Sequence, residues 1–309
     1  MMSPTSFDTG IIFLIQTVLG IIGNSSLLCL YTFTVLSGHL LKPIDLILSQ
    51  LVLANSVVLF SKGIPQTMIT LGWNYFLDDT RCKLVFYFYR VGTGASFTIV
   101  CLFNGFQAIK LNPRICRCTW IQLKIRSLKF IGGCCLLIWF LHFLMNSFLP
   151  VIVDGPLNER NLSIETNHGS CSWKMPEHAS IYTLLYFFPD MMTLVFMIWA
   201  SGLVILVLHR HKQRVQHTHS SSLSSGASNE DRATCRIVTL VIFFATFYSV
   251  YLSLTLQMVL AENSSKWRVN SSVLLASCFP TISPYVLIIS DTRVSRVCFT
   301  CKAKDKAFH

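Results

Sequence analysis

Seven long apolar runs constrain the fold of this chain more than any other feature of its sequence. They cover residues 10–34, 44–68, 83–111, 129–153, 181–208, 236–260 and 273–290. At ~1.5 Å per residue, each run is long enough to cross roughly 30 Å of hydrocarbon as a helix. The pattern predicts an all-α membrane protein, a bundle of seven transmembrane helices whose two termini lie on opposite sides of the bilayer.

The overall composition supports a membrane protein and a single domain. The chain has 309 residues, of which only 13% are charged, and its mean hydropathy is +0.56. A soluble domain this apolar has too little polar surface to cover itself. The net charge of +11 would indicate a nucleic-acid partner only if it lay on one soluble face. Here it follows the loops, so we expect a lipid bilayer and no nucleic acid as partner.

The lysine and arginine positions predict the orientation of the bundle. Seventeen of the 25 Lys and Arg residues lie at Lys42, in 110–129, in the linker 209–235 with its flank Arg236, and in the tail 291–309. Because cytoplasmic loops carry an excess of positive charge, the N-terminus is expected outside and the tail inside. Residues 1–9 have no basic region before the first run, so we expect that helix itself to direct insertion into the plasma membrane.

Cysteines and one glycan acceptor fit this topology. Of twelve cysteines, only Cys82 and Cys171 fall on the extracellular side, and a bridge would tie the third helix to the loop after the fourth. Two free extracellular thiols are the alternative. In the same loop, Asn161-Leu162-Ser163 is an acceptor for an N-linked glycan, used or unused.

Ionisable residues inside the runs are candidate site residues, because each is costly at membrane depth. Lys62, Arg90 and Asp190 all fall in the outer portions of their helices. The hypothesis is that Arg90 and Asp190 line a ligand cavity with Lys62 at its rim. The alternative, snorkelling of the side chain to the lipid headgroups, fits Lys62 better than the short Asp190. Asp45 and Asp291 lie near inner ends, where local contacts are expected.

No pattern in the sequence predicts catalysis or a cofactor. A phosphate-binding Gly-rich loop, a His-Glu-x-x-His pattern and a Gly-x-Ser-x-Gly turn are all missing. The serine- and histidine-rich linker holds four histidines, His209, His211, His217 and His219, that a metal could use. We expect a solvated basic flank near anionic lipid there, and no metal. A small transporter or channel stays open, although seven runs without an internal repeat argue against one.

A set of local motifs stands in order along the chain: 42–46 (KPIDL), 61–65 (SKGIP), 89–91 (YRV), 106–109 (FQAI), 188–190 (FPD), 198–202 (IWASG), 210–217 (RHKQRVQH), 232–234 (RAT) and 279–285 (FPTISPY). Together they resemble the motifs of the vomeronasal type-1 (pheromone) receptors among seven-helix G-protein-coupled receptors. The resemblance covers nearly the whole chain. It departs at Thr93, where the family pattern often has an arginine, which would alter ligand charge preference or packing.

The resemblance implies a receptor for small chemosignals that activates an inhibitory-class heterotrimeric G protein. The Asp-Arg-Tyr triplet of many larger-family receptors is replaced by Phe106-Gln107-Ala108, and a bitter-taste-type receptor, which also lacks the triplet, is the alternative. The inner face expected to meet the G protein and anionic lipid comprises Gln107, Lys110, Arg114, Arg210, Lys212, Arg214, Arg232 and Arg236. Cys298 and Cys301 in the tail are candidates for palmitoylation.

Overall fold

The structure is a computed structural model of the chain. It describes residues 4–37, 42–73, 78–111, 124, 127–154, 171–173, 188, 190–199, 201–203, 205–206, 209–210, 242–243, 245–254 and 266–290. The predicted glycan acceptor Asn161, most of the linker and the tail lie outside these residues.

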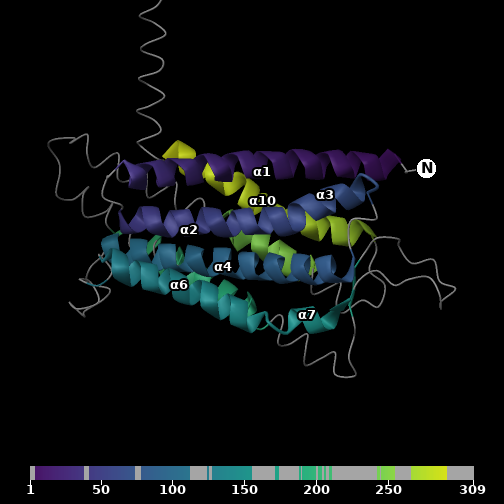
Figure 1. Cartoon of the computed structure of the whole chain (residues 1–309). Helices are drawn as coiled ribbons and strands as arrows, with labels where there is room; N and C mark the ends of the chain where they lie inside the picture. The colour runs from purple at the N-terminus through teal and green to yellow at the C-terminus, as the bar shows by residue number, and fades with distance from the viewer. Residues whose placement is uncertain are drawn as a thin grey trace, which may run out of the picture.

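Long helices running side by side make up the described part of the molecule (Figure 1). In chain order the elements are α1 (Pro4–Leu36), α2 (Pro43–Val58), the π-helical turn η1 (Leu59–Gly63), α3 (Ile64–Thr70), α4 (Asp79–Leu111), α6 (Leu128–Met145), α7 (Leu149–Ile152), β1 (Val153–Asp154), β2 (Ser172–Trp173) and α10 (Lys266–Ser290). Residues 190–199 and 245–254 are also helical. The two short strands pair antiparallel, Val153 opposite Trp173.

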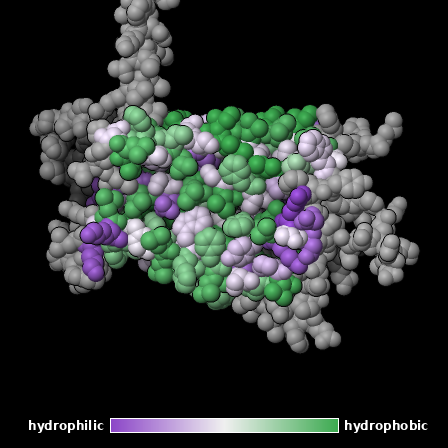
Figure 2. Space-filling model, viewed as in Figure 1, coloured by the Kyte–Doolittle hydropathy of each residue, from purple (hydrophilic) through white to green (hydrophobic). Residues whose placement is uncertain are grey.

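Five of the described helices are long and apolar enough to cross a membrane. They are Asp8–Leu36, Pro43–Thr70, Asp79–Lys110, Leu128–Val151 and Asn270–Ile289, and each matches one predicted run. Large apolar side chains face outward on them: Leu136 is 72% exposed and Phe140 62%. Figure 2 shows hydrophobic residues over most of the visible face and hydrophilic ones mainly towards its two ends. Such a surface is stable in lipid and not in water, which confirms the predicted helical membrane protein.

The outer end of the bundle is recognised by its disulfide. Gly10 near the start of α1 lies against Thr70 and Leu71 at the end of α3. The bond between Cys82 and Cys171 lies at the start of α4, the same end in Figure 1 as α3 and the N-terminus. Because disulfides persist in oxidising compartments, this end is extracellular, in agreement with the distribution of positive charge.

The second membrane-crossing helix changes geometry near its outer end. Proline has no N–H to donate to the preceding turn, and its ring crowds the carbonyl four residues earlier. Pro65 stands at that point, and the chain widens into the π-helical turn η1, where the Ile64 N–H binds the Leu59 carbonyl five residues back. The inner start of α2 is more regular, with Pro43 in its first turn and the Asp45 carboxylate accepting the Lys42 N–H at 3.4 Å.

The packing of α2 against α4 is the most extensive helix contact in the described part of the chain. Gly92 makes the close approach possible: a Cβ there would lie 3.2 Å from the Ala54 carbonyl oxygen and 3.0 Å from Val57. Small residues serve this purpose in membrane helices. Side chains such as Val52, Phe97 and Ile99 are buried around this contact. The centre of the bundle therefore lies along α4.

Candidate functional site

The outer end of α4 is tied down covalently. Cys82 and Cys171 are 89 residues apart in sequence, and their Cα atoms lie 5.7 Å apart across the disulfide. Cys82 is buried together with Val153 of β1, and Phe86 one turn further along α4 packs against them. The predicted bridge is confirmed, and it joins α4 to the chain that follows the α6 span.

One helical turn below this cluster of apolar side chains, a buried ion pair connects two helices. The Arg90 Nη1 donates to Asp190 Oδ2 at 2.7 Å, and the two side chains are 6% and 10% exposed. Arg90 belongs to α4, and Asp190 begins the 190–199 helix. A pair this well buried depends on each partner, because either charge left alone would be strongly disfavoured. The sequence hypothesis placed both residues at one cavity, and the structure brings them into direct contact.

Tyrosines extend the contact to a third helix. The hydroxyls of Tyr89 and Tyr251 lie 3.1 Å apart, and both residues are buried. Tyr248, one turn away from Tyr251, packs its ring 4.3 Å from that of Phe97, measured between centroids. Within residues 89–97, α4 therefore contacts both the 190–199 helix, through Arg90, and the 245–254 helix, through Tyr89 and Phe97.

Lys62 of η1 contacts the same part of α4 as the ion pair and Tyr89. Its ammonium is 4.5 Å from the centroid of the Phe86 ring and 5.9 Å from that of Tyr89. Both rings belong to α4, so the side chain of Lys62 crosses from η1 to α4. Contact with these rings directs Lys62 towards α4. Lys62 is not among the residues that line the cavity described below, so its position at the rim of a ligand cavity stays a prediction.

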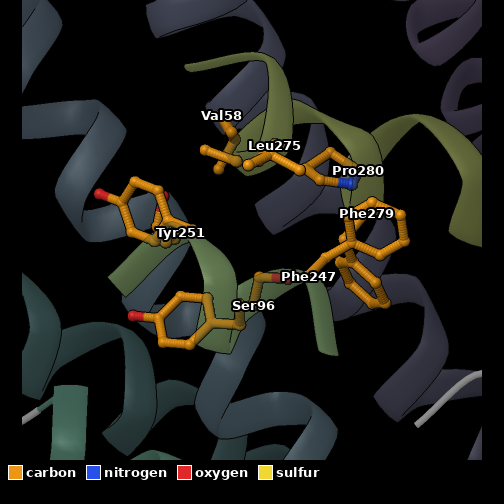
Figure 3. A pocket seen from close by; sticks show the side chains of 10 residues that line it. Val58, Ser96, Phe247, Tyr251, Leu275, Phe279 and Pro280 are labelled. Atoms are coloured by element: carbon orange, nitrogen blue, oxygen red, sulfur yellow. The ribbon is translucent and has the colours of Figure 1, made fainter. Parts of the chain in front are cut away.

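A narrow cavity lies beside Tyr248 and Tyr251, and Thr93, about one turn below Arg90 on α4, lines it as well. Its walls come from α2, α4, the 245–254 helix and α10 (Figure 3), and include Val58, Thr93, Tyr251, Leu275 and Phe279. Its free volume is about 20 Å³, room for a single water molecule. The Thr93 hydroxyl is buried there and has no hydrogen-bond partner among the described residues. A ligand larger than water would have to part these helices in order to enter.

Below the cavity, Asn55 links three helices through polar contacts. Ser96 of α4 donates its hydroxyl to Asn55 Oδ1 at 2.9 Å, and Asn55 Nδ2 donates to the Ser283 hydroxyl of α10 at 2.9 Å. All three residues are buried. Buried hydrogen-bonded groups of this kind couple the positions of the helices that carry them.

At the inner end, the described residues include only part of the predicted inner face. Lys110 and Arg210 are exposed, whereas Gln107 is 5% exposed and packs inside the bundle. The remaining members, Arg114, Lys212, Arg214, Arg232 and Arg236, lie outside the described residues. Within the described ranges, no group of three His, Cys, Asp or Glu side chains comes together to hold a metal ion.

Sequence reasoning missed the uncharged polar residues of the site. For the outer site only ionisable residues were candidates, so Tyr89, Tyr251, Asn55 and Ser96 were not named as members of one group. The signal was present, since each of these polar groups interrupts an apolar run, and polar groups inside spans face the bundle interior or a partner.

Comparison with known proteins finds close relatives over nearly the whole chain. The sequence model of the vomeronasal organ pheromone receptor family matches residues 7–300. Vomeronasal type-1 receptor 1 of Homo sapiens is 54% identical, over 99% of this chain and 88% of the human protein. Vomeronasal type-1 receptor 4 of Pongo pygmaeus is 41% identical, over 93% of this chain and 95% of that protein. Olfactory receptor class A-like protein 1 of Danio rerio is 28% identical, over 96% and 94%.

Proposed function

Because this chain belongs to the vomeronasal organ pheromone receptor family, we propose that it binds a small chemosignal in the outer half of the bundle and activates a heterotrimeric G protein of the inhibitory class. The observation that carries the proposal is the buried Arg90–Asp190 ion pair beside the cavity. Family membership decides against the bitter-taste-type receptor and the transporter. Since its relatives are receptors, we infer no enzymatic role.

The small size of the cavity suggests how a ligand would act. A ligand changes a conformational equilibrium only by binding one state better than the other. Moving a receptor from 1:99 to 99:1 in favour of its active state takes a difference of about 5.5 kcal/mol. A ligand that enters between Arg90, Asp190 and Tyr251 would be accommodated only if α4 and its two neighbouring helices move apart. The state with parted helices is then the state that the ligand stabilises.

The inner end is the proposed site of G-protein contact. Lys110 and Arg210 are exposed there, and with the other predicted basic residues they would face both anionic lipid and the G protein. Gln107 is buried, so its contact with a partner would require the inner end to open. Asn55, which connects α2, α4 and α10 midway along the bundle, is well placed to transmit such a movement.

The direct test is ligand-evoked G-protein activation in cells that express the chain with one class of α subunit at a time. A screen of small organic chemosignals should give responses with the inhibitory class, and Arg90→Lys or Asp190→Asn should lower potency at least tenfold. Lys83→Gln is the matched control, because Lys83 pairs with Asp79 at 2.7 Å on the exposed outer end of α4. Ligand-driven flux without any G-protein response would refute the proposal.

A further inference from the structure

Lys62 lies within an apolar membrane-length helix, where lysines are rare, and its ammonium meets the aromatic rings of a neighbouring helix. Lys62 lies eight residues before Thr70, the end of α3, which places it about 12 Å along the helix from the outer end. A lysine at this depth usually extends towards the headgroups. Here the ammonium instead lies over Phe86 and Tyr89 of α4. The lysine is therefore directed towards the interior face of α4.

The π-helical turn contributes to this direction. A π-helical turn holds one residue more than an α-helical turn, so it rotates the side chains before it by about 100° relative to those after it. Lys62 lies within this turn, at Leu59–Gly63. Turns of this kind occur frequently at functional sites. The helix thus departs from regular geometry at the residue that presents the charge.

The charges around Lys62 do not balance among the described residues. Arg90 pairs with Asp190, Lys83 with Asp79 and Arg81 with Asp78. Within the described ranges, Lys62 has no carboxylate oxygen within 4.0 Å, and its charge meets only the two ring faces. Ring faces attract a cation but accept no strong hydrogen bond, and an ammonium has three N–H donors to offer. The described part of the site therefore carries one positive charge in excess.

The position of Lys62 relative to the cavity indicates what the uncharged part of an anionic ligand would contact. Val58, which lines the cavity, is one turn below Lys62 on the same helix, and Thr93 is one turn below Tyr89. The cavity walls between them are mostly apolar, with Leu275 and Phe279 on the α10 side. An anionic group at Lys62 would leave an attached apolar group pointing into these walls.

We propose that Lys62 binds the anionic group of the ligand, so that this receptor recognises small organic anions with an apolar body. The inference rests on the proposed function, since it names the ligand class for the same outer site. Lys62 supplies the charge that the Arg90–Asp190 pair does not, because that pair is neutral as a unit.

The test uses the purified full chain in nanodiscs of zwitterionic lipid, with probes that differ in charge and little in shape. The pairs are 4-phenylbutyrate with 4-phenylbutanamide, and naphthalene-2-sulfonate with naphthalene-2-sulfonamide. Thermal unfolding is followed against probe concentration, because a ligand that binds the folded state raises the Tm by mass action. At least one anion should bind the wild type tenfold or more tightly than its neutral partner, as expected for a charge-assisted hydrogen bond.

Three variants locate the effect. Lys62→Met keeps the length and the contact with Phe86 but removes the charge, and it should abolish the preference for the anion. Lys62→Arg keeps the charge and should retain the preference. Lys83→Gln removes one positive charge from the same end of the molecule, outside the site, and should leave the preference unchanged. A wild type without any anion preference, or Lys62→Met with the preference intact, would overturn the proposal.

Nucleotide exchange on the inhibitory-class G protein, measured with the same probes, separates this inference from the proposed function. If neutral probes drive exchange as well as anions do, and Lys62→Met responds like the wild type, the receptor function stands and the role of Lys62 is wrong. If anions bind through Lys62 and no G protein responds, the anion site stands and the receptor proposal is wrong.

Discussion

At the scale of single residues, the candidate site follows one side of α4. Cys82, Phe86, Arg90 and Thr93 are spaced three or four residues apart, so they succeed one another at roughly one turn each. Each meets a different partner: the disulfide, the Lys62 ammonium, the Asp190 carboxylate and the cavity. Arg90 is the member whose neighbourhood most strongly constrains its chemistry, because its charge is buried and already matched by one carboxylate.

The ion pair predicts a characteristic non-additivity. Arg90→Met or Asp190→Leu alone leaves an uncompensated buried charge, which should destabilise the receptor by about 3–5 kcal/mol. The double variant removes both charges and should lose clearly less stability than the two single losses added together. The measurement is the Tm of the purified receptor for all four proteins, together with surface delivery in cells. Additive losses would mean that the two side chains do not interact in the folded protein.

At the scale of the helices, glycines allow α4 to lie close to two neighbours. Gly92 faces the backbone of α2 at Ala54, and Gly94 faces the ring of His142 in α6. The His142 Nε2 also lies 2.9 Å from the Thr98 hydroxyl on the next turn of α4. Close packing on two sides of α4, immediately below the ion pair, therefore fixes the position of Arg90 relative to α2 and α6.

Substitution of these glycines should have effects that depend on position. Gly92→Ala would press a methyl group onto a backbone carbonyl that cannot rotate away, so we expect a loss of about 1–3 kcal/mol of stability. Gly105→Ala on the same helix is the matched control, because no atom of the described residues lies within 4 Å of its Cβ position. There the better helix propensity of alanine should leave stability equal or up to about 1 kcal/mol higher. Thermal unfolding of both variants decides the point, and equal effects would contradict the packing.

At the scale of the whole molecule, a covalent link at the outer end closes a long loop across the bundle. Cys82 and Cys171 are 89 positions apart in the sequence, and the chain between them includes the whole of α6. In the chain-entropy model, closing a loop of this size stabilises the folded state by about 4–5 kcal/mol. The helix α4 is thus held at its outer end by the disulfide, and below the ion pair by its packing against α2 and α6.

Loss of this link should prevent delivery of the receptor. Cys171→Ser is expected to reduce surface expression severely, measured by labelling of an extracellular N-terminal tag on intact cells. Cys29→Ser is the matched control, because Cys29 is a free, exposed cysteine in α1, and its removal should change nothing. Normal delivery and signalling of Cys171→Ser would show that the disulfide is dispensable.

The sequence by itself determined the membrane class, five of the spans that the structure describes, the orientation and the disulfide. Those properties depend on quantities that add along the chain, namely apolar length, the side on which positive charge accumulates and the compartment of a cysteine. It also nominated Lys62, Arg90 and Asp190, because a charge at membrane depth is rare whatever surrounds it.

Only the tertiary structure decided what those residues contact. Arg90 and Asp190 are 100 residues apart in sequence, and whether they meet depends on the rotation of two helices about their axes. The direction of Lys62 depends on a π-helical turn, and the contacts of Asn55 and Tyr251 on the level at which their helices pass α4. The rotation of each helix about its axis and its position along the bundle are set by packing at close approaches such as Gly92. Many small contacts act together there, and no short stretch of sequence specifies the outcome.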